Sequence, residues 1–143
     1  MGNNITRSIK GKEIEQKWLL VDATDIRLGK LATKCAALLM GKGNVNSVDY
    51  LNSGAQIVVV NASKISFFPT KLITKVYPRH SGYPGGFREA KFADLIVSKP
   101  DYIIRQAVWG MLPKNKMGRK MLKNLHISNG IEHKYNAQSP TKV

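Results

Sequence analysis

The chain has 143 residues, of which 23 are Lys or Arg and 9 are Asp or Glu, and its formal net charge is +14 with a pI of about 10.1. This length fits one domain with a buried core, and a hydrophobic fraction of 43% argues against a disordered basic tail. A compact domain with this charge repels itself unless a polyanion neutralises it, so the composition predicts a nucleic-acid partner. No segment approaches the roughly 18 apolar residues of a membrane-spanning helix, and residues 1–16 lack the apolar core of a signal peptide. We therefore expect no membrane partner.

The first half of the domain has the pattern of a strand, a helix and a second strand. Residues 18–21 form a short apolar run that predicts a buried strand. The next helix is expected to be capped by Asp25 and ended by Gly41 and Gly43. Residues 57–60 are β-branched without interruption, which is typical of a strand covered on both faces. Such a unit implies a parallel strand pair with a right-handed crossover. The helix has an apolar stripe of Leu28, Leu31, Ala32, Cys35, Leu38 and Leu39, with Arg27, Lys30 and Lys34 on the opposite side.

The second half is predicted to be more helical. A short helix around residues 92–96 is closed by Pro100, and a helix over about 101–112 is ended by Pro113. A third helix is expected over 116–125, and residues 126–128 are expected to form a last strand followed by a turn. On the third helix the cations Lys116, Arg119, Lys120 and Lys123 share one arc, and the apolar residues Met117, Met121, Leu122 and Leu125 share another. The expected organisation is an N-terminal arm over 1–15, an RNA-binding α/β domain over 16–135 and a polar C-terminal tail over 136–143.

Two long stretches contain no acidic residue. The first runs from residue 51 to 87 and the second from 102 to 131, whereas the acidic residues lie mainly in the flanks. Scattered lysines usually mark a solvated surface, but acid-free stretches of this length favour a polyanion site. The first stretch carries Lys64, Lys71, Lys75 and Arg79, and the second carries Arg105, Lys114, Lys116, Arg119, Lys120 and Lys123.

The segment from Arg79 to Gly86 combines charge with glycine. Its glycines alone would make a turn, but glycine also lets a backbone come close to a ligand and exposes N–H groups to phosphate. Arg79 and Arg88 add charge, and Tyr83 or Phe87 could stack on a base or ribose. We interpret this segment as an RNA contact. The two tryptophans, Trp18 and Trp109, are interpreted as packing residues.

No enzyme signature emerges from the sequence. Gly41-Lys42-Gly43 lacks the remaining residues of a phosphate-binding loop, and the glycines of 82–86 do not form a dinucleotide fingerprint. The single cysteine, Cys35, allows no internal disulfide or thiolate zinc cluster, and the three histidines are dispersed. We expect no catalytic residues, no metal, no cofactor and no small-molecule substrate.

A series of short motifs resembles one known family. In order they are Trp18-x-x-Val21-Asp22-Ala23, Leu28-Gly29-Lys30-Leu31-Ala32, Gly54 before Ile57-Val58-Val59-Val60-Asn61-Ala62, Lys75-Val76-Tyr77, His80-x-Gly82, Gly85-Gly86, Gly110-Met111-Leu112-Pro113, Gly118-Arg119, Glu132-His133 and Gln138-x-Pro140. Over about residues 16–140 these resemble the L-thirteen family of large-subunit ribosomal proteins, in its bacterial or organellar form. The chain departs from the family pattern at Ala55, where an acid is usual, at Pro69-Thr70, where a Thr-Gly turn is usual, and at Trp109, where a basic residue is common.

The resemblance implies a three-layer α/β/α domain with a four-stranded, mainly parallel sheet. It also implies binding to large-subunit ribosomal RNA, early assembly, neighbouring ribosomal proteins as partners, and no catalysis. The expected location is the ribosome, in the cytoplasm or in an organelle. Two alternatives remain at this point: an RNA-binding regulator outside the ribosome and an RNA-modifying enzyme. The residues expected to contact RNA are Arg27, Lys30, Lys34, Lys71, Lys75, Arg79, His80, Gly82, Gly85, Gly86, Arg88, Lys114, Lys116, Arg119, Lys120 and Lys123.

Overall fold

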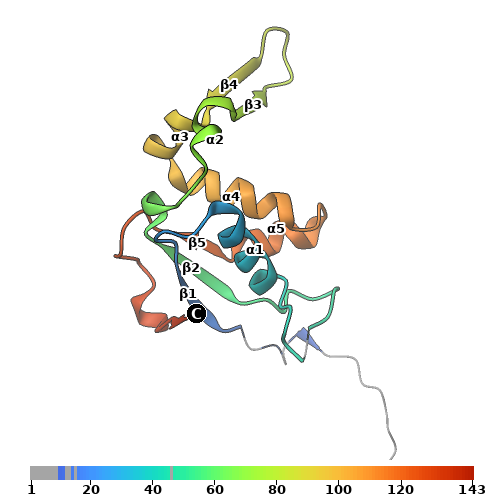
Figure 1. Cartoon of the computed structure of the whole chain (residues 1–143). Helices are drawn as coiled ribbons and strands as arrows, with labels where there is room; N and C mark the ends of the chain where they lie inside the picture. Colours follow the sequence, from blue (N-terminus) through green and yellow to red (C-terminus); the bar gives the residue numbers. More distant parts are fainter. Residues whose placement is uncertain (1–9, 12–13, 15, 46) are drawn as a thin grey trace, which may run out of the picture.

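The computed structural model describes residues 10–11, 14, 16–45 and 47–143, so the predicted N-terminal arm lies largely outside the described residues. The chain combines a central sheet, its helices and a separate two-stranded hairpin (Figure 1). The described elements are β1 (Trp18–Asp22), α1 (Leu28–Leu39), β2 (Gln56–Val60), η2 (Ala62–Lys64), α2 (Pro69–Thr74), β3 (Val76–His80), β4 (Phe87–Lys91), α3 (Phe92–Ser98), α4 (Pro100–Met111), α5 (Lys116–Lys123), β5 (Leu125–Ile127), η3 (Asn136–Gln138) and β6 (Thr141–Lys142). None of the described helices is both long and apolar enough to cross a membrane.

The sheet has the strand order β5-β2-β1-β6, and all three pairings are parallel. The predicted α/β class with a four-stranded, mainly parallel sheet is therefore confirmed. β2 is central and its last four residues are buried, as its unbroken β-branched run indicated. The segment expected to be a polar C-terminal tail, residues 136–143, contains β6, which pairs with Leu19 and Leu20 of β1. The predicted last strand is β5, which is followed along the chain by β6.

One face of the sheet forms the main core with α1 and α4. The alternate strand residues Val21, Ile57 and Val59 are fully buried there and belong to one cluster with the apolar stripes of both helices. On α1 the buried residues are Leu28, Leu31, Ala32, Cys35, Ala36 and Leu39, so the predicted stripe is confirmed, with Leu38 only half-buried. At the helix end Lys42 N–H donates to Ala37 O, and Gly41 is in the left-handed region at φ 73°, as in a Schellman motif.

The predicted helix cap at Asp25 was wrong. Asp25 lies in a turn with φ 55°, and α1 begins later, at Leu28. The residue in the N-cap position is Arg27, whose side chain makes no capping bond. The N–H of Leu28 donates instead to the carbonyl of Ser66, so a backbone contact from a distant segment replaces the side-chain cap.

The opposite face of the sheet is covered by aromatic packing from the C-terminal segment. Trp18 of β1 stacks on His126 of β5, with 5.6 Å between ring centroids. Tyr135 packs on both rings, and its hydroxyl lies 2.9 Å from His126 Nδ1. Trp18 is therefore a packing residue, as predicted.

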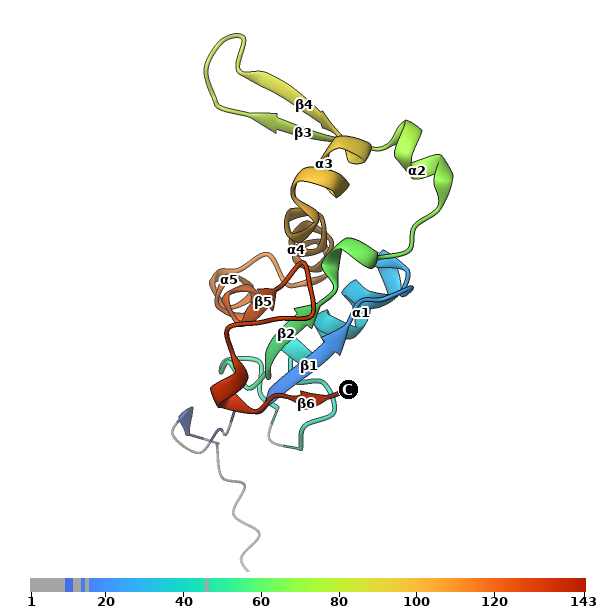
Figure 2. The same cartoon turned by 90° about the vertical axis from the view of Figure 1, so that its left-hand side faces the viewer.

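The β3–β4 hairpin extends away from the sheet, joined to it through α2 and α3 (Figures 1 and 2). Phe92, at the start of α3, is fully buried and contacts the rings of Phe67 and Tyr77, which anchors the base of the hairpin. The sequence predicted a turn here but no strands, because β3 contains Pro78 and both strands are mostly exposed.

The helices of the second half begin and end close to the predicted residues. Pro100 opens α4 as well as following α3, and α4 ends at Met111. The third helix, α5, ends at Lys123 and not at the predicted Leu125, because Leu125 enters the sheet opposite Ile57.

Gly118 of α5 lies so close to Pro113 that a Cβ there would be 1.9 Å from the Pro113 carbonyl oxygen. This contact requires glycine and fixes the direction in which α5 leaves the loop.

Candidate nucleic-acid interface

The outer side of α1 and the start of α2 form one basic surface, here called the α1 surface. Arg27, Lys30 and Lys34 are exposed at helical spacing, because the apolar stripe turns them away from the core. Lys71 of α2 joins them through an exposed aromatic ring: Arg27 Cζ lies 4.7 Å and Lys71 Nζ 5.9 Å from the centroid of Phe68. The structure thus brings together cations that lie more than 40 residues apart in the sequence.

A second basic surface, the α5 surface, consists of Lys116, Arg119, Lys120 and Lys123. All four are exposed, while Gly118 and Met121 on the other side of α5 are buried. Asn115 caps the helix, its Oδ1 accepting the Gly118 N–H at 2.7 Å. Lys114, in the loop before α5, folds back so that its Nζ lies 4.3 Å from the centroid of the Trp109 ring and donates to the Trp109 carbonyl.

The hairpin places two further arginines on one side of a ribbon. Arg79 and Arg88 are directly opposite each other in the antiparallel pair, and both are exposed. Like charges in opposed positions repel, so this pair is unfavourable in the isolated protein and becomes favourable beside an anion. Lys75 is half-buried at the base of the hairpin, with its Nζ 5.1 Å from the centroid of the Tyr77 ring.

The hairpin loop uses several of its polar groups internally. His80 Nδ1 accepts the Gly82 N–H at 2.9 Å, so the ring proton of a neutral His80 is on Nε2. The Gly86 N–H donates to Tyr83 O, and Ser81 N–H donates to Gly86 O. Gly82 and Gly85 have φ values of 92° and 71°. Glycine adopts this left-handed backbone conformation without strain, which explains why glycine occupies both positions. The amides of Gly82 and Gly86 are therefore engaged within the loop in this conformation.

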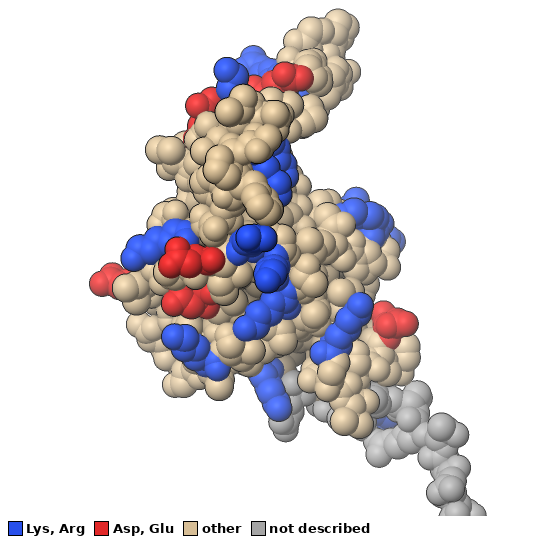
Figure 3. All heavy atoms as spheres, viewed as in Figure 1, with Lys and Arg blue, Asp and Glu red and all other residues tan. Residues whose placement is uncertain are grey.

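Between described residues, none of the cations on these surfaces lies within salt-bridge distance of a carboxylate. Figure 3 shows Lys and Arg spread over one face of the molecule from the hairpin to its far end, with fewer Asp and Glu. The hairpin lies apart from the sheet domain that carries the α1 and α5 surfaces (Figure 2).

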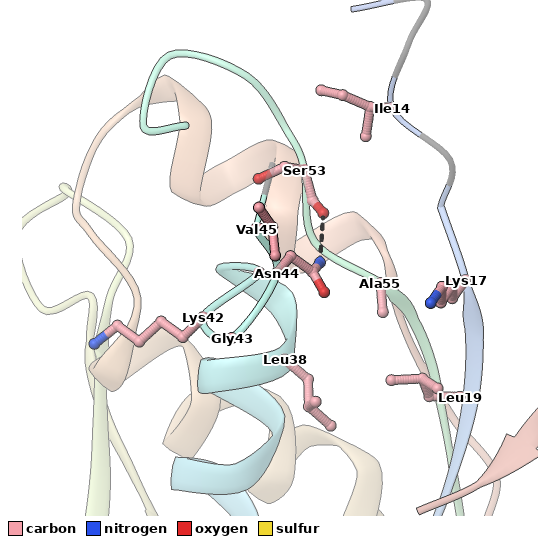
Figure 4. A pocket seen from close by; sticks show the side chains of 11 residues that line it. Ile14, Lys17, Leu19, Leu38, Lys42, Gly43, Asn44, Val45, Ser53 and Ala55 are labelled. Atoms are coloured by element: carbon pink, nitrogen blue, oxygen red, sulfur yellow. Dashed lines mark hydrogen bonds between the residues drawn. The ribbon is translucent and has the colours of Figure 1, made fainter. Parts of the chain in front are cut away.

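The cavities differ in their lining: one of about 550 Å³ is lined by residues that include His126, Glu132 and His133, whereas another has no such side chains. A cavity of about 570 Å³ lies beside the C-terminal turn of α1, where Asn44 Nδ2 donates to Ser53 O and the Lys42 side chain extends away from the other lining residues (Figure 4). The described residues that line it include no Asp, Glu, His or Cys. Among the described residues, no three His, Cys, Asp or Glu side chains gather in a way that could hold a metal ion. Burial raises the pKa of the Cys35 thiol to about 12, so this cysteine is protonated at neutral pH.

Comparison with known proteins places this chain in one family. The family described as Ribosomal protein L13 matches residues 16–134. The chain belongs to the L13 family. It is 42% identical over 134 residues to the large ribosomal subunit protein uL13 of Thermoanaerobacter sp. (strain X514), which covers 94% of each chain. It is 42% identical to the uL13 of Alcanivorax borkumensis over 138 residues, covering 96% of this chain and 97% of the relative. With the uL13 of Thermotoga petrophila the identity is 44% over 138 residues, covering 96% and 93%.

The three positions at which the sequence is expected to depart from the L13 pattern fall at structurally distinct places. Ala55 is buried just before β2, and its N–H donates to Leu38 O. Pro69 is the first residue of α2, where its fixed φ suits a helix start. Trp109, interpreted from the sequence as packing, is half-buried against the core and also lines a groove between α4 and α5.

Sequence reasoning about this L13 chain missed that groove and the ring of Phe68. Tyr102, Arg105 and Trp109 recur at helical spacing on α4, a signal that was present in the sequence. What the spacing could not show is that Arg119 and Lys123 of α5 pack opposite them. Phe68 gave no sequence signal at all, because its link to Arg27 and Lys71 arises only in the folded chain.

Proposed function

We propose that this chain is a structural constituent of the large ribosomal subunit that binds large-subunit ribosomal RNA through the α1 surface, the α5 surface and the arginines of the hairpin. The observation that carries the proposal is that these cations are exposed and unpaired with acids in the described structure of an L13 family member. The L13 relatives are named as large ribosomal subunit proteins. L13 is a family of ribosomal structural proteins, and no enzyme signature accompanies it here.

The mechanism is scaffolding by charge neutralisation. The α1 and α5 surfaces stand on helices packed against the same core, so their cations are held at fixed relative positions. Phosphates from separate RNA helices that bind both surfaces would be held in one geometry. Little sequence reading is expected from these surfaces, because side chains recognise RNA helices mainly through shape, phosphate and 2′-hydroxyl contacts.

The hairpin would extend this contact into a neighbouring RNA groove. Arg79 and Arg88 project from the same side of the ribbon, and Tyr83 is 74% exposed in the loop between the strands. With the amides of Gly82 and Gly86 engaged internally, the arginine side chains supply the positive charge of the hairpin that would bind phosphate. Binding of this kind early in assembly would fix an RNA junction before later proteins, including neighbouring large-subunit proteins, join.

The proposal is tested by RNA binding and by sedimentation. If the protein neutralises about 6 to 10 phosphates, raising the salt concentration from about 50 to 200 mM should lower its affinity for structured ribosomal RNA by roughly three to five decades, by analogy with duplex DNA. In cells the protein should sediment with the large subunit through a high-salt wash. A flat salt dependence, or a protein found mainly in the soluble pool, would contradict the proposal and favour a regulator or an RNA-modifying enzyme.

A further inference from the structure

The outer faces of α4 and α5 enclose a groove that shares Arg119 and Lys123 with the α5 surface and adds residues of α4. Its volume is about 360 Å³. One wall is made by Tyr102, Arg105, Gln106 and Trp109 of α4. The other wall is made by Arg119, Leu122 and Lys123 of α5. The groove therefore has two aromatic rings and an aliphatic side chain inside a frame of three cations.

The positive charge around this groove indicates the sign of the charge that its ligand should carry. Arg105 comes from α4, whereas Arg119 and Lys123 come from the opposite wall, and no acidic residue occurs among the groove residues or anywhere from 102 to 131. Arg119 and Lys123 are exposed, and Arg105 is half-buried with one terminal nitrogen 3.5 Å from Leu125 O. A ligand in the groove would be surrounded by positive charge from both helices, so it should be an anion or be attached to one.

The aromatic rings specify that this ligand also has a planar, apolar part. The Trp109 ring is held by Lys114, whose Nζ lies 4.3 Å from the ring centroid. Gln106 Nε2 donates to the Tyr102 hydroxyl at 3.0 Å, which orients the amide and leaves Oε1 as a hydrogen-bond acceptor. An aromatic wall with one polar acceptor and flanking cations suits a nucleobase, which has a π-face for stacking, amino groups on its edge and an attached phosphate.

We propose that the groove between α4 and α5 binds an unpaired nucleotide of RNA, with the base against Trp109 and Tyr102 and the adjacent phosphates on Arg119 and Lys123. A base inside a duplex is stacked on its neighbours and cannot stack on the rings of the groove, whereas a nucleotide in a loop or bulge can be splayed out. An acidic protein segment would satisfy the cations but would leave the two rings without a stacking partner. The groove thus recognises an unpaired position, whereas the basic surfaces bind phosphates of any structured RNA. This inference rests on the proposed function, because it names the RNA feature that one part of the interface selects.

Trp109 provides a direct readout, because the only other tryptophan is Trp18. In a Trp18→Phe background the fluorescence reports on the groove alone, and the phenyl ring keeps an aromatic partner for His126. The probes are a short unstructured oligoribonucleotide, the blunt duplex that it forms with its complement, and poly-glutamate of similar charge. We expect saturable quenching by the single strand and little quenching by the duplex or poly-glutamate at equal occupancy. Equal quenching by the duplex would show phosphate binding without base entry, and equal quenching by poly-glutamate would show an acidic-protein groove. Either result would overturn the inference.

Variants separate base stacking from charge. Trp109→Ala should lower the ratio of single-strand to duplex affinity about tenfold, in the range measured when stacking aromatics are removed, and Trp109→Phe should keep most of that ratio. The matched charge control is Lys120→Gln on the same helix, which should weaken binding of both RNAs and leave their ratio unchanged. Thermal melts confirm that each variant is folded. If duplex binding is salt-dependent but Trp109→Ala has the same ratio of single-strand to duplex affinity as the parent protein, the groove inference fails and the proposed function stands. If neither RNA binds, both fail.

Discussion

The close approach of Gly118 to Pro113 predicts that replacing Gly118 with alanine, which adds only a methyl group, destabilises the protein. In Gly118→Ala the new methyl group would lie 1.9 Å from the Pro113 carbonyl oxygen and 3.1 Å from its carbonyl carbon. Both atoms are backbone, so no side-chain rotation relieves the overlap. The start of α5 would have to shift, and this shift would disturb the 2.7 Å hydrogen bond from Gly118 N–H to Asn115 Oδ1.

Two effects of opposite sign decide the size of the change. Alanine is favoured over glycine in a helix by about 1 kcal/mol. Forcing a group into a filled site costs about 1 to 3 kcal/mol, and an overlap with fixed backbone belongs at the upper end. The expected net loss of unfolding free energy is therefore about 2 kcal/mol. For a domain of this size that lowers the melting temperature by about 6 °C.

The measurement is a thermal melt followed by circular dichroism, with urea unfolding as a second estimate. Gly110→Ala in α4 and Gly29→Ala in α1 are matched controls, because a Cβ at either position meets nothing within 4 Å. These controls should be as stable as the wild-type protein or more stable by up to about 1 kcal/mol. If Gly118→Ala is as stable as the controls, the close contact at Pro113 is not a constraint, and the explanation given for glycine in this segment is refuted.

Three further predictions concern the core and the strand ends. Because burial raises the pKa of the Cys35 thiol to about 12, the native protein should resist thiol alkylation at pH 8 and react at the rate of unfolding, whereas rapid labelling of folded protein would contradict the assigned burial. The side chain of Asn61, followed by the hydroxyl and N–H of Thr24, lowers the pKa of Asp22 to about 2. This interaction should therefore stabilise the fold above pH 3.8 and be lost as the pH falls toward 2. Because solvent screens the partly exposed Asp22 carboxylate, Asn61→Ala should cost only about 1 kcal/mol near pH 7 and less at pH 2, and a cost independent of pH would count against the hydrogen bond to Asp22. Val59→Asp places a carboxylate at a fully buried position in β2 and should abolish cooperative melting, so a folded variant would contradict the central placement of that strand.

Local periodicity predicted those parts of the fold that bury one regular face. The buried stripe of α1 and the four buried residues of β2 were predictable because their apolar patterns are long and match one geometry. β6 was not predictable, because its two exposed residues join the sheet through backbone pairing with β1 and carry no apolar pattern. The strands of the hairpin were hidden for a similar reason, since Pro78 and exposed polar residues are atypical of strands.

The candidate interface was predictable as a set of residue types and less so as an arrangement. The four cations of α5 share one face because helical spacing places them there. The pairing of Arg27 with Lys71 around Phe68 depends on how α1 and α2 pack, and no local pattern encodes it. The internal hydrogen bonds of Gly82 and Gly86 also depend on loop geometry, so the sequence alone overstated how many amides the loop exposes.

The central claim is that exposed cations bind ribosomal RNA, and incorporation of a charge-reversed protein into large subunits tests it most directly. The variant is Arg119→Glu with Lys120→Glu, both exposed on α5. The control is Lys42→Glu with Lys134→Glu, which changes the net charge equally at two exposed positions outside the proposed interface. Since neither pair is buried, both variants should melt close to the wild-type temperature. We predict that the control enters large subunits and the α5 variant does not. Normal incorporation of the α5 variant at physiological salt would show that this helix face is only solvated surface and would contradict the account.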